Sequence, residues 1–113
     1  MKLLLLIVLC GFCFSLTSSG NGKTVFEKRC SGCHALDREK EGPRLGGVYG
    51  RTAGSLDSFE YSDALKRSKI KWTGQMLDQW LTDPDKLVPG TDMQIRVPDA
   101  AEREAIIEYL KKN

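Results

Sequence analysis

The chain has 113 residues, with 17 basic and 15 acidic side chains and a formal net charge of +2 at pH 7. This length suits one small domain. The nearly balanced charge, with no basic run interleaved with aromatic residues, argues against a nucleic-acid-binding protein.

The beginning of the chain has the composition of a secretory signal peptide. A basic residue is followed by an apolar run over residues 3–16 and then by small polar residues. The run has 14 residues, whereas a membrane-spanning helix needs roughly 20. We therefore predict that residues 1–20 are cleaved on export, and that one domain, residues 21–113, remains without stable insertion in a membrane. Retention of the segment as an anchor is the alternative, and Cys10 and Cys13 within it have no expected role.

Helix signals follow one another along the mature domain, and no segment shows the alternation of a strand, so an all-α fold is predicted. Asn21 caps a first helix that runs into Cys30. Residues 41–54 contain five glycines and one proline and predict an irregular loop. A short helix is expected over residues 61–67.

The second half of the domain predicts two longer helices separated by a loop. Thr73 caps the first of them, and Pro84 ends it because proline disfavours helix at the residue before it. Residues 86–98, with two prolines and a glycine, predict a loop. Asp99 then caps the last helix. Each helix has one apolar face, formed by Met76, Leu77, Trp80 and Leu81 in the first and by Ile106, Ile107 and Leu110 in the last.

Residues 30–34, Cys-Ser-Gly-Cys-His, have the C-x-x-C-H pattern of covalent haem attachment. Two thiols at this spacing reach the same edge of a porphyrin and add across its two vinyl groups. The histidine that follows is held beneath the iron and supplies an axial nitrogen. The motif therefore predicts one haem c, bound covalently through Cys30 and Cys33 and ligated by His34.

The same residues have two alternative interpretations. A thioredoxin-like redox pair would need a strand–helix–strand context, which the sequence lacks. A structural zinc site needs four ligands, and Cys30, Cys33 and the only histidine of the chain, His34, supply three. Haem is the more consistent interpretation.

The other axial position of the iron is left to methionine, lysine, water or nothing, because the chain has no second histidine. Met93 lies in a loop with proline and glycine, from which an unbranched thioether can reach the iron. Methionine and histidine together are the ligands of electron-carrying haem proteins of this type. Met76 lies on an apolar helical face and is expected in the core. Met93 is thus the predicted ligand, and a gap-filling role for it is the alternative.

With these residues in place, the sequence resembles the class I cytochromes c, the family of mitochondrial cytochrome c and bacterial cytochrome c2. The resemblance spans residues 22–112 and depends on the order and spacing of short blocks. The matching blocks are Gly22 with Phe26; Cys30 to His34; Gly42-Pro43 with Leu45; Gly50-Arg51 with Gly54; Phe59, Tyr61, Asp63 and Ala64; Ile70 with Trp72; Pro89-Gly90-Thr91 with Met93; and Tyr109 to Lys112.

The resemblance implies that the four predicted helices wrap around one covalent haem. It implies that the carbonyl of Pro43 accepts the ring N–H of His34. It also implies that Phe26 and Tyr109 join the first and last helices. The residues that match positions near the haem propionates are Arg51, Tyr61, Trp72 and Thr91.

Two departures from the family pattern concern the haem pocket. Trp80 stands where relatives usually have a tyrosine near the methionine, and Leu65 stands where many have an asparagine near the haem. We expect a drier pocket, which opposes the charge gained on oxidation and so favours the reduced iron.

A third departure concerns the face used for docking. Asp85 and Asp92 stand where relatives often have lysine, while Arg29 and Lys86 keep positive charge. Steering by a strongly basic face is therefore not expected, and electron transfer to an acidic partner should fall only weakly with added salt.

The resemblance implies a single-haem electron carrier rather than an enzyme, acting as a monomer between a cytochrome-reducing complex, a dehydrogenase or an oxidase. A dedicated haem subunit of one oxidoreductase complex is an alternative. A haem peroxidase or gas sensor is another, which the lack of a second histidine disfavours. The signal-peptide pattern predicts the bacterial periplasm, because mitochondrial relatives are imported without such a segment.

Overall fold

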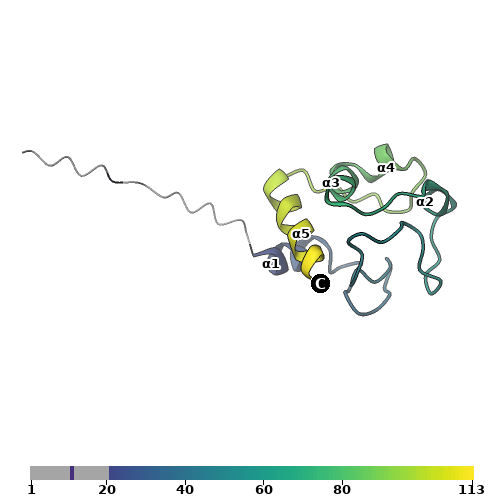
Figure 1. Cartoon of the computed structure of the whole chain (residues 1–113), viewed down its shortest axis with the longest axis horizontal. Helices are drawn as coiled ribbons and strands as arrows, with labels where there is room; N and C mark the ends of the chain where they lie inside the picture. The colour runs from purple at the N-terminus through teal and green to yellow at the C-terminus, as the bar shows by residue number, and fades with distance from the viewer. Residues whose placement is uncertain (1–10, 12–20) are drawn as a thin grey trace, which may run out of the picture.

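The computed structural model describes Gly11 and residues 21–113; the rest of the predicted signal peptide, residues 1–20, lies outside the described part. Residues 21–113 form helices and one isolated bridge, between Thr52 and Lys71, so the predicted all-α fold is confirmed. The helices are α1 (Gly22–Arg29), α2 (Asp63–Ser68), α3 (Gly74–Thr82), α4 (Pro84–Leu87) and α5 (Ala100–Lys112) (Figure 1). In this part of the chain, no helix is both long and apolar enough to cross a membrane.

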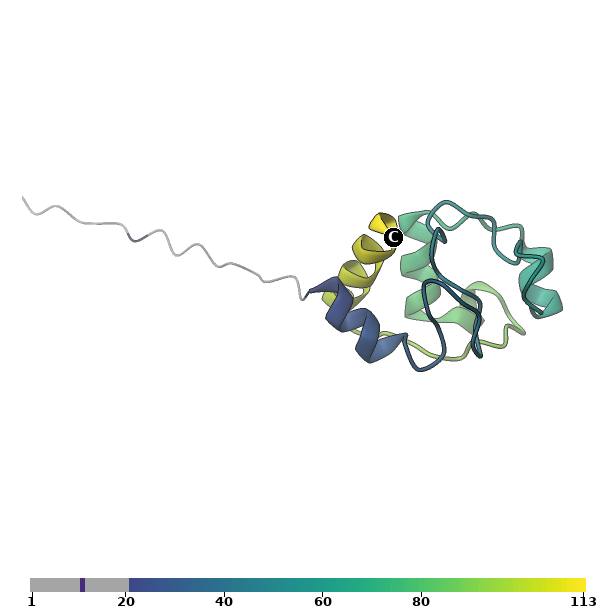
Figure 2. The ribbon, with the colours of Figure 1, turned by 90° about the horizontal axis from the view of Figure 1, so that it is seen from below.

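The first and last helices lie side by side, as Figures 1 and 2 show from two directions. The rings of Phe26 and Tyr109 pack with their centroids 5.2 Å apart, which confirms the expected contact between these helices. Gly22 permits the close approach, because a Cβ there would lie 2.6 Å from the Ala105 carbonyl oxygen.

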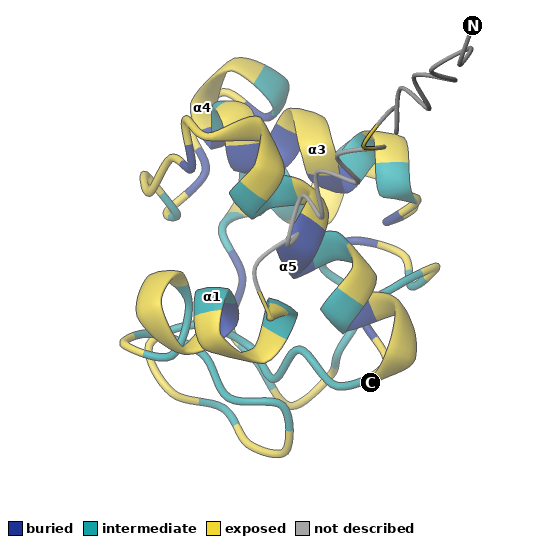
Figure 3. Ribbon diagram, turned by 90° about the vertical axis from the view of Figure 1, so that its left-hand side faces the viewer, coloured by how far each residue is buried: buried dark blue, intermediate teal, exposed yellow. Residues whose placement is uncertain are grey.

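Helix α3 packs against α5, and buried apolar side chains of both helices contribute to the core. Leu77, Trp80 and Leu81 are buried on α3, and Ile106 on α5 is completely buried. The ring of Trp80 packs edge-on against Trp72, with the centroids 5.2 Å apart. In Figure 3 the buried positions of α1, α3 and α5 occupy one side of each helix, and the other sides are exposed.

Three helices begin where side-chain caps were predicted. Asn21 accepts a hydrogen bond from the Lys23 amide at 3.1 Å, Thr73 from Met76 at 3.2 Å, and Asp99 from Glu102 at 3.0 Å. The short helix predicted over residues 61–67 is shifted to α2, because the Ser62 hydroxyl caps it by accepting from the Leu65 amide at 3.2 Å.

The prediction of a loop over residues 86–98 is wrong for its first two residues, which belong to α4. Pro84 ends α3 as expected, but it also occupies the first turn of a new helix, where its missing N–H and fixed φ are tolerated. Asp83 caps this helix by accepting from the Lys86 amide at 3.3 Å. The remainder of the segment, residues 88–98, is loop.

The long segment between α1 and α2 is folded by backbone hydrogen bonds without regular structure, which confirms the loop predicted over residues 41–54. The amides of Leu45 and Gly46 donate to the carbonyls of Ala35 and Leu36, both at 2.9 Å. A further bond of 2.7 Å joins the Gly50 amide to the Trp72 carbonyl. The segment is thereby closed against the rest of the domain and forms a wall of the site described below.

Candidate haem site

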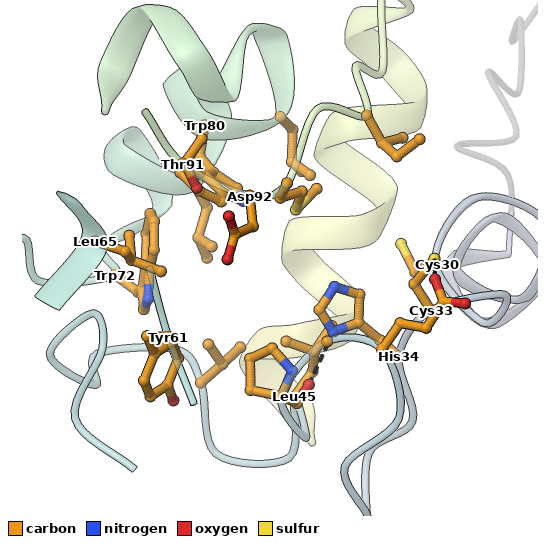
Figure 4. Close-up of a pocket in the computed structure, with 18 of the residues that line it drawn as sticks. Cys30, Cys33, His34, Leu45, Tyr61, Leu65, Trp72, Trp80, Thr91 and Asp92 are labelled. Atoms are coloured by element: carbon orange, nitrogen blue, oxygen red, sulfur yellow. Dashed lines mark hydrogen bonds between the residues drawn. The ribbon is translucent and has the colours of Figure 1, made fainter. Parts of the chain in front are cut away.

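A cavity of about 470 Å³ lies between the helices and this long segment. Its lining is mostly apolar, with buried residues from α3, α5 and the loops, and its volume falls within the roughly 300–1,000 Å³ usual for cofactor sites. Figure 4 shows Cys30, Cys33 and His34 on one side, with Trp80, Thr91 and Asp92 across the cavity from them. Tyr61, Leu65 and Trp72 occupy a further side.

The two cysteines stand at the end of α1, where Cys30 is the C-cap. The amides of Cys33 and His34 donate to the Cys30 carbonyl at 3.2 and 2.9 Å, so the motif turns tightly and brings all three side chains to the cavity. Both thiols are free. Burial raises the pKa of the Cys30 thiol to about 11. The pKa of Cys33 is also raised, first by its hydrogen bond to Glu41 at 3.4 Å. Both groups are therefore protonated thiols at neutral pH, the form whose S–H adds across a vinyl group.

His34 is held as a neutral imidazole. Its Nδ1 lies 2.8 Å from the carbonyl oxygen of Pro43, as the family resemblance implied. A carbonyl only accepts, so Nδ1 carries the proton and Nε2 keeps its lone pair. Burial lowers the pKa of the imidazole, which keeps the ring uncharged. Gly42 leaves room for the ring, because a Cβ there would lie 2.6 Å from Nδ1 and 2.8 Å from Nε2.

Of the two methionines in the described part, only Met93 lines the cavity. Its loop is held by a hydrogen bond of 3.1 Å from the Gly90 amide to Asp85, and by one of 2.8 Å from Gln94 to the Thr91 carbonyl. Both methionines pack against the hydrophobic core, but Met76 is not part of the cavity lining. The thioether of Met93 thus belongs to the same stretch of cavity wall as Thr91 and Asp92.

One region of the cavity wall carries a positive charge. Arg51 donates from Nη2 to the Arg44 carbonyl at 3.0 Å and from Nη1 to the Gly46 carbonyl at 3.3 Å. No carboxylate of residues 21–113 forms an ion pair with it. Burial lowers the pKa of its guanidinium, so the cation is costly until an anion joins it. Tyr61 and Trp72 are buried nearby on the same lining, as expected for residues around acidic substituents of a ligand.

The two substitutions expected to dry the pocket also line the cavity. Trp80 is 7% exposed, and Leu65 presents an apolar side chain where an amide was expected from the family pattern. Thr91 is buried at 5% exposure, whereas Asp92 beside it is exposed.

No pattern in the sequence singles out Glu41, although its carboxylate contacts the Cys33 thiol and lines the cavity. The two residues are eight positions apart on an irregular segment, where no periodic pattern predicts which side chains meet. The zinc alternative finds no support, because residues 21–113 contain no cluster of three or more His, Cys, Asp or Glu side chains placed to hold a metal ion.

The fold and the cavity define a small all-helical protein that encloses one cofactor. Residues 19–113 match the sequence profile of the cytochrome c family. Cytochrome c 2.1 of Caenorhabditis elegans is 41% identical over 93 residues, which cover 80% of this chain and 84% of that relative. Cytochrome c2 of Blastochloris viridis is 37% identical over 98 residues, which cover 83% and 76%. The structure of cytochrome cH from Methylobacterium extorquens superposes with a TM-score of 0.78 at 41% identity, covering 82% of this chain and 96% of that one.

The chain therefore belongs to the cytochrome c family. It follows that its cofactor is a covalently attached haem c and that its class is that of electron carriers. The residues present fit this cofactor. Two free thiols, a neutral imidazole and a thioether surround an apolar cavity, and an unpaired guanidinium suits the carboxylates of a porphyrin.

Proposed function

We propose that this protein is a single-haem electron carrier in which Cys30 and Cys33 bind the haem covalently, and His34 and Met93 are its axial ligands. One observation carries the proposal. Two thiols and an imidazole share one wall of an apolar cavity, and a thioether lies on the segment across it. No other arrangement of side chains around this cavity offers both attachment and two axial ligands.

The cofactor, when bound, supplies an iron that alternates between the ferrous and ferric states. The chain's own residues fix the conditions under which this happens. The Pro43 carbonyl orients His34 so that Nε2 faces the cavity, and Gly42 leaves space for the ring. Leu65, Trp72 and Trp80 exclude water and favour the less charged ferrous form.

The same residues support a carrier rather than an enzyme. With His34 and Met93 both bound to the iron, no position would be left for a substrate, and a rigid shell would change little with oxidation state. Arg51 would oppose the positive charge of the iron and pair with the negative charge of the propionates, to which Tyr61 and Trp72 would donate hydrogen bonds.

We further propose that the protein is exported to the bacterial periplasm after cleavage near residue 20, and that it acts there as a monomer. The signal-peptide pattern at the beginning of the sequence supports this location. Its partners would be a cytochrome-reducing complex, a dehydrogenase or an oxidase. Because Asp85 and Asp92 are exposed and Asp92 borders the cavity, transfer to an acidic partner should depend only weakly on ionic strength.

The absorption spectrum of the exported protein tests the ligand set. We expect the ferric form to show the weak red band of methionine ligation, and expect Met93→Ala to abolish it. Met76→Ala is the matched control and should keep the band, because Met76 packs in the core and does not line the cavity. A band that survives in Met93→Ala, or is lost only in Met76→Ala, would refute Met93 as the ligand.

A further inference from the structure

The long segment between α1 and α2 contains a hydrogen-bonded cluster on the side of the domain that holds Arg51. Its members are Glu39, Arg44 and Ser58. The Glu39 carboxylate accepts from Ser58 Oγ at 2.6 Å and from Arg44 Nη1 at 2.9 Å, and the same Arg44 nitrogen donates to Ser58 Oγ at 3.1 Å. The three side chains thus form a closed triangle.

The triangle joins two stretches of chain that line the cavity. Arg44 directly follows Pro43, whose carbonyl orients His34, and Glu39 lies earlier in the same stretch. Ser58 immediately precedes Phe59, which lines the cavity. The Glu39 and Arg44 side chains are 29% and 39% exposed, so their ion pair is more shielded from solvent than the pair of Asp37 with Arg38, whose side chains are 79% and 65% exposed. The hydrogen bond from Ser58 is the first cause of the lowered pKa of Glu39, which keeps the carboxylate charged.

Arg44 also links the triangle to the cavity through its backbone. Its carbonyl oxygen accepts from Arg51 Nη2 at 3.0 Å, which is the shorter of the two hydrogen bonds that hold the Arg51 guanidinium. A guanidinium has five N–H donors in a fixed fork, so the position of one carbonyl determines the direction of the whole cation. A shift of Arg44 would therefore redirect the positive charge on the cavity wall.

We propose that Glu39, Arg44 and Ser58 are positioning residues that set the reduction potential by fixing the carbonyl that holds Arg51. This inference rests on the proposed function, because it takes the cavity as the site of the haem. The cation beside the haem opposes the additional positive charge of the ferric iron and so favours reduction. When the triangle is broken, Arg51 is free to swing toward solvent and this contribution falls.

The test is the reduction potential of the haem-loaded protein in a double-substitution cycle. The variant Glu39→Gln/Arg44→Gln removes the ion pair without changing the net charge. We expect it to lower the equilibrium constant for reduction about threefold. Because a tenfold change in a one-electron equilibrium corresponds to about 59 mV, the potential should fall by ~30 mV. In an Arg51→Gln background the same two substitutions should change the potential by much less, because they act through Arg51.

Two further variants distinguish positioning from general loosening. Asp37→Asn/Arg38→Gln breaks an ion pair of 3.0 Å in the same segment, whose side chains are 79% and 65% exposed, and should leave the potential unchanged. Arg44→Lys retains the positive charge and a group that donates hydrogen bonds, so it should keep most of the wild-type potential. Ser58→Ala is a smaller change and should lower the potential by a smaller amount. This variant provides the test if the double variant does not load haem.

An equal shift with and without Arg51, or no shift in the double variant and in Ser58→Ala, would overturn the proposal. A missing red band in the wild-type protein would instead count against Met93 as the ligand. The role of the triangle would still be decided by the potentials of the variants.

Discussion

Two halves of this domain enclose the same cavity but are held together by different interactions. In the helical half, α1, α3 and α5 meet through buried apolar side chains such as Phe26, Leu77 and Ile106. In the loop half, residues 35–61, backbone hydrogen bonds and the Glu39–Arg44 ion pair hold the chain, and few side chains are fully buried. The helical half contributes most of the buried core, to which the loop half adds Val48 and Ala53, whereas the rest of the loop half is held by backbone hydrogen bonds around the cavity.

This difference predicts where substitutions act. In the helical half they should change the free energy of unfolding in proportion to the buried volume that is lost. In the loop half they should change chiefly the haem environment, since this half contributes His34's partner and Arg51.

The largest effect is expected from Ile106→Ala in the helical half. Ile106 is 0% exposed, and its truncation leaves a cavity in the core. We expect a loss of about 2–5 kcal/mol in the free energy of unfolding of the haem-loaded protein, measured by denaturant titration. Glu104→Ala, at an exposed position on the same helix, is the control and should change stability by less than about 0.5 kcal/mol. Similar losses in both would contradict the assignment of the core.

A smaller effect, of a different kind, is expected from Gly42→Ala in the loop half. The added methyl would lie 2.6 Å from Nδ1 of His34, so either the ring or the loop must move. We expect a loss of about 1–3 kcal/mol together with altered absorption of the haem, because the His34 orientation changes.

Gly32→Ala is the matched control for that substitution. A Cβ at Gly32 meets nothing within 4 Å, although Gly32 lies between the two cysteines of the attachment motif. Its spectrum should equal that of the wild-type protein. If Gly42→Ala lowered stability without any spectral change, the contact with His34 would not be the cause.

The smallest effect is expected at the ion pair between α1 and α5. Arg29 Nε lies 2.5 Å from the Glu102 carboxylate, and this hydrogen bond is the first cause of the lowered pKa of Glu102, whose usual value is 4.5. A carboxyl whose pKa is lower in the folded state stabilises the fold above its unfolded pKa, and this stability is lost as the pH falls through the folded pKa.

Melting temperatures of the wild type and of Glu102→Gln should therefore differ at neutral pH and converge in acid, below the usual pKa of 4.5. Glu108→Gln, on the exposed side of α5, should show no such convergence. A difference between the wild type and Glu102→Gln that persists unchanged in acid would mean that the charge of Glu102 does not stabilise the helix pair.

Much of the fold could be predicted because its signals are local. The caps at Asn21, Thr73 and Asp99 lie within three residues of the amides they satisfy, so the sequence alone reveals them. α4 was missed because a proline read as a helix stop also serves as a helix start. Whether Pro84 only ends one helix or also begins another depends on whether the chain can turn at Asp83. That turn is decided by the surrounding packing.

The order and spacing of residues determined the family and the helical class of this protein, and they predict the site of covalent attachment. Cys30, Cys33 and His34 are neighbours in the chain, so one tight turn suffices to bring them to the same wall. Tertiary structure alone decided which distant groups meet there: Glu41 at the Cys33 thiol, and the Arg44 carbonyl at Arg51. These contacts join irregular segments, in which no helical or strand period relates sequence position to direction, and their partners emerge only when the loops close around the cavity.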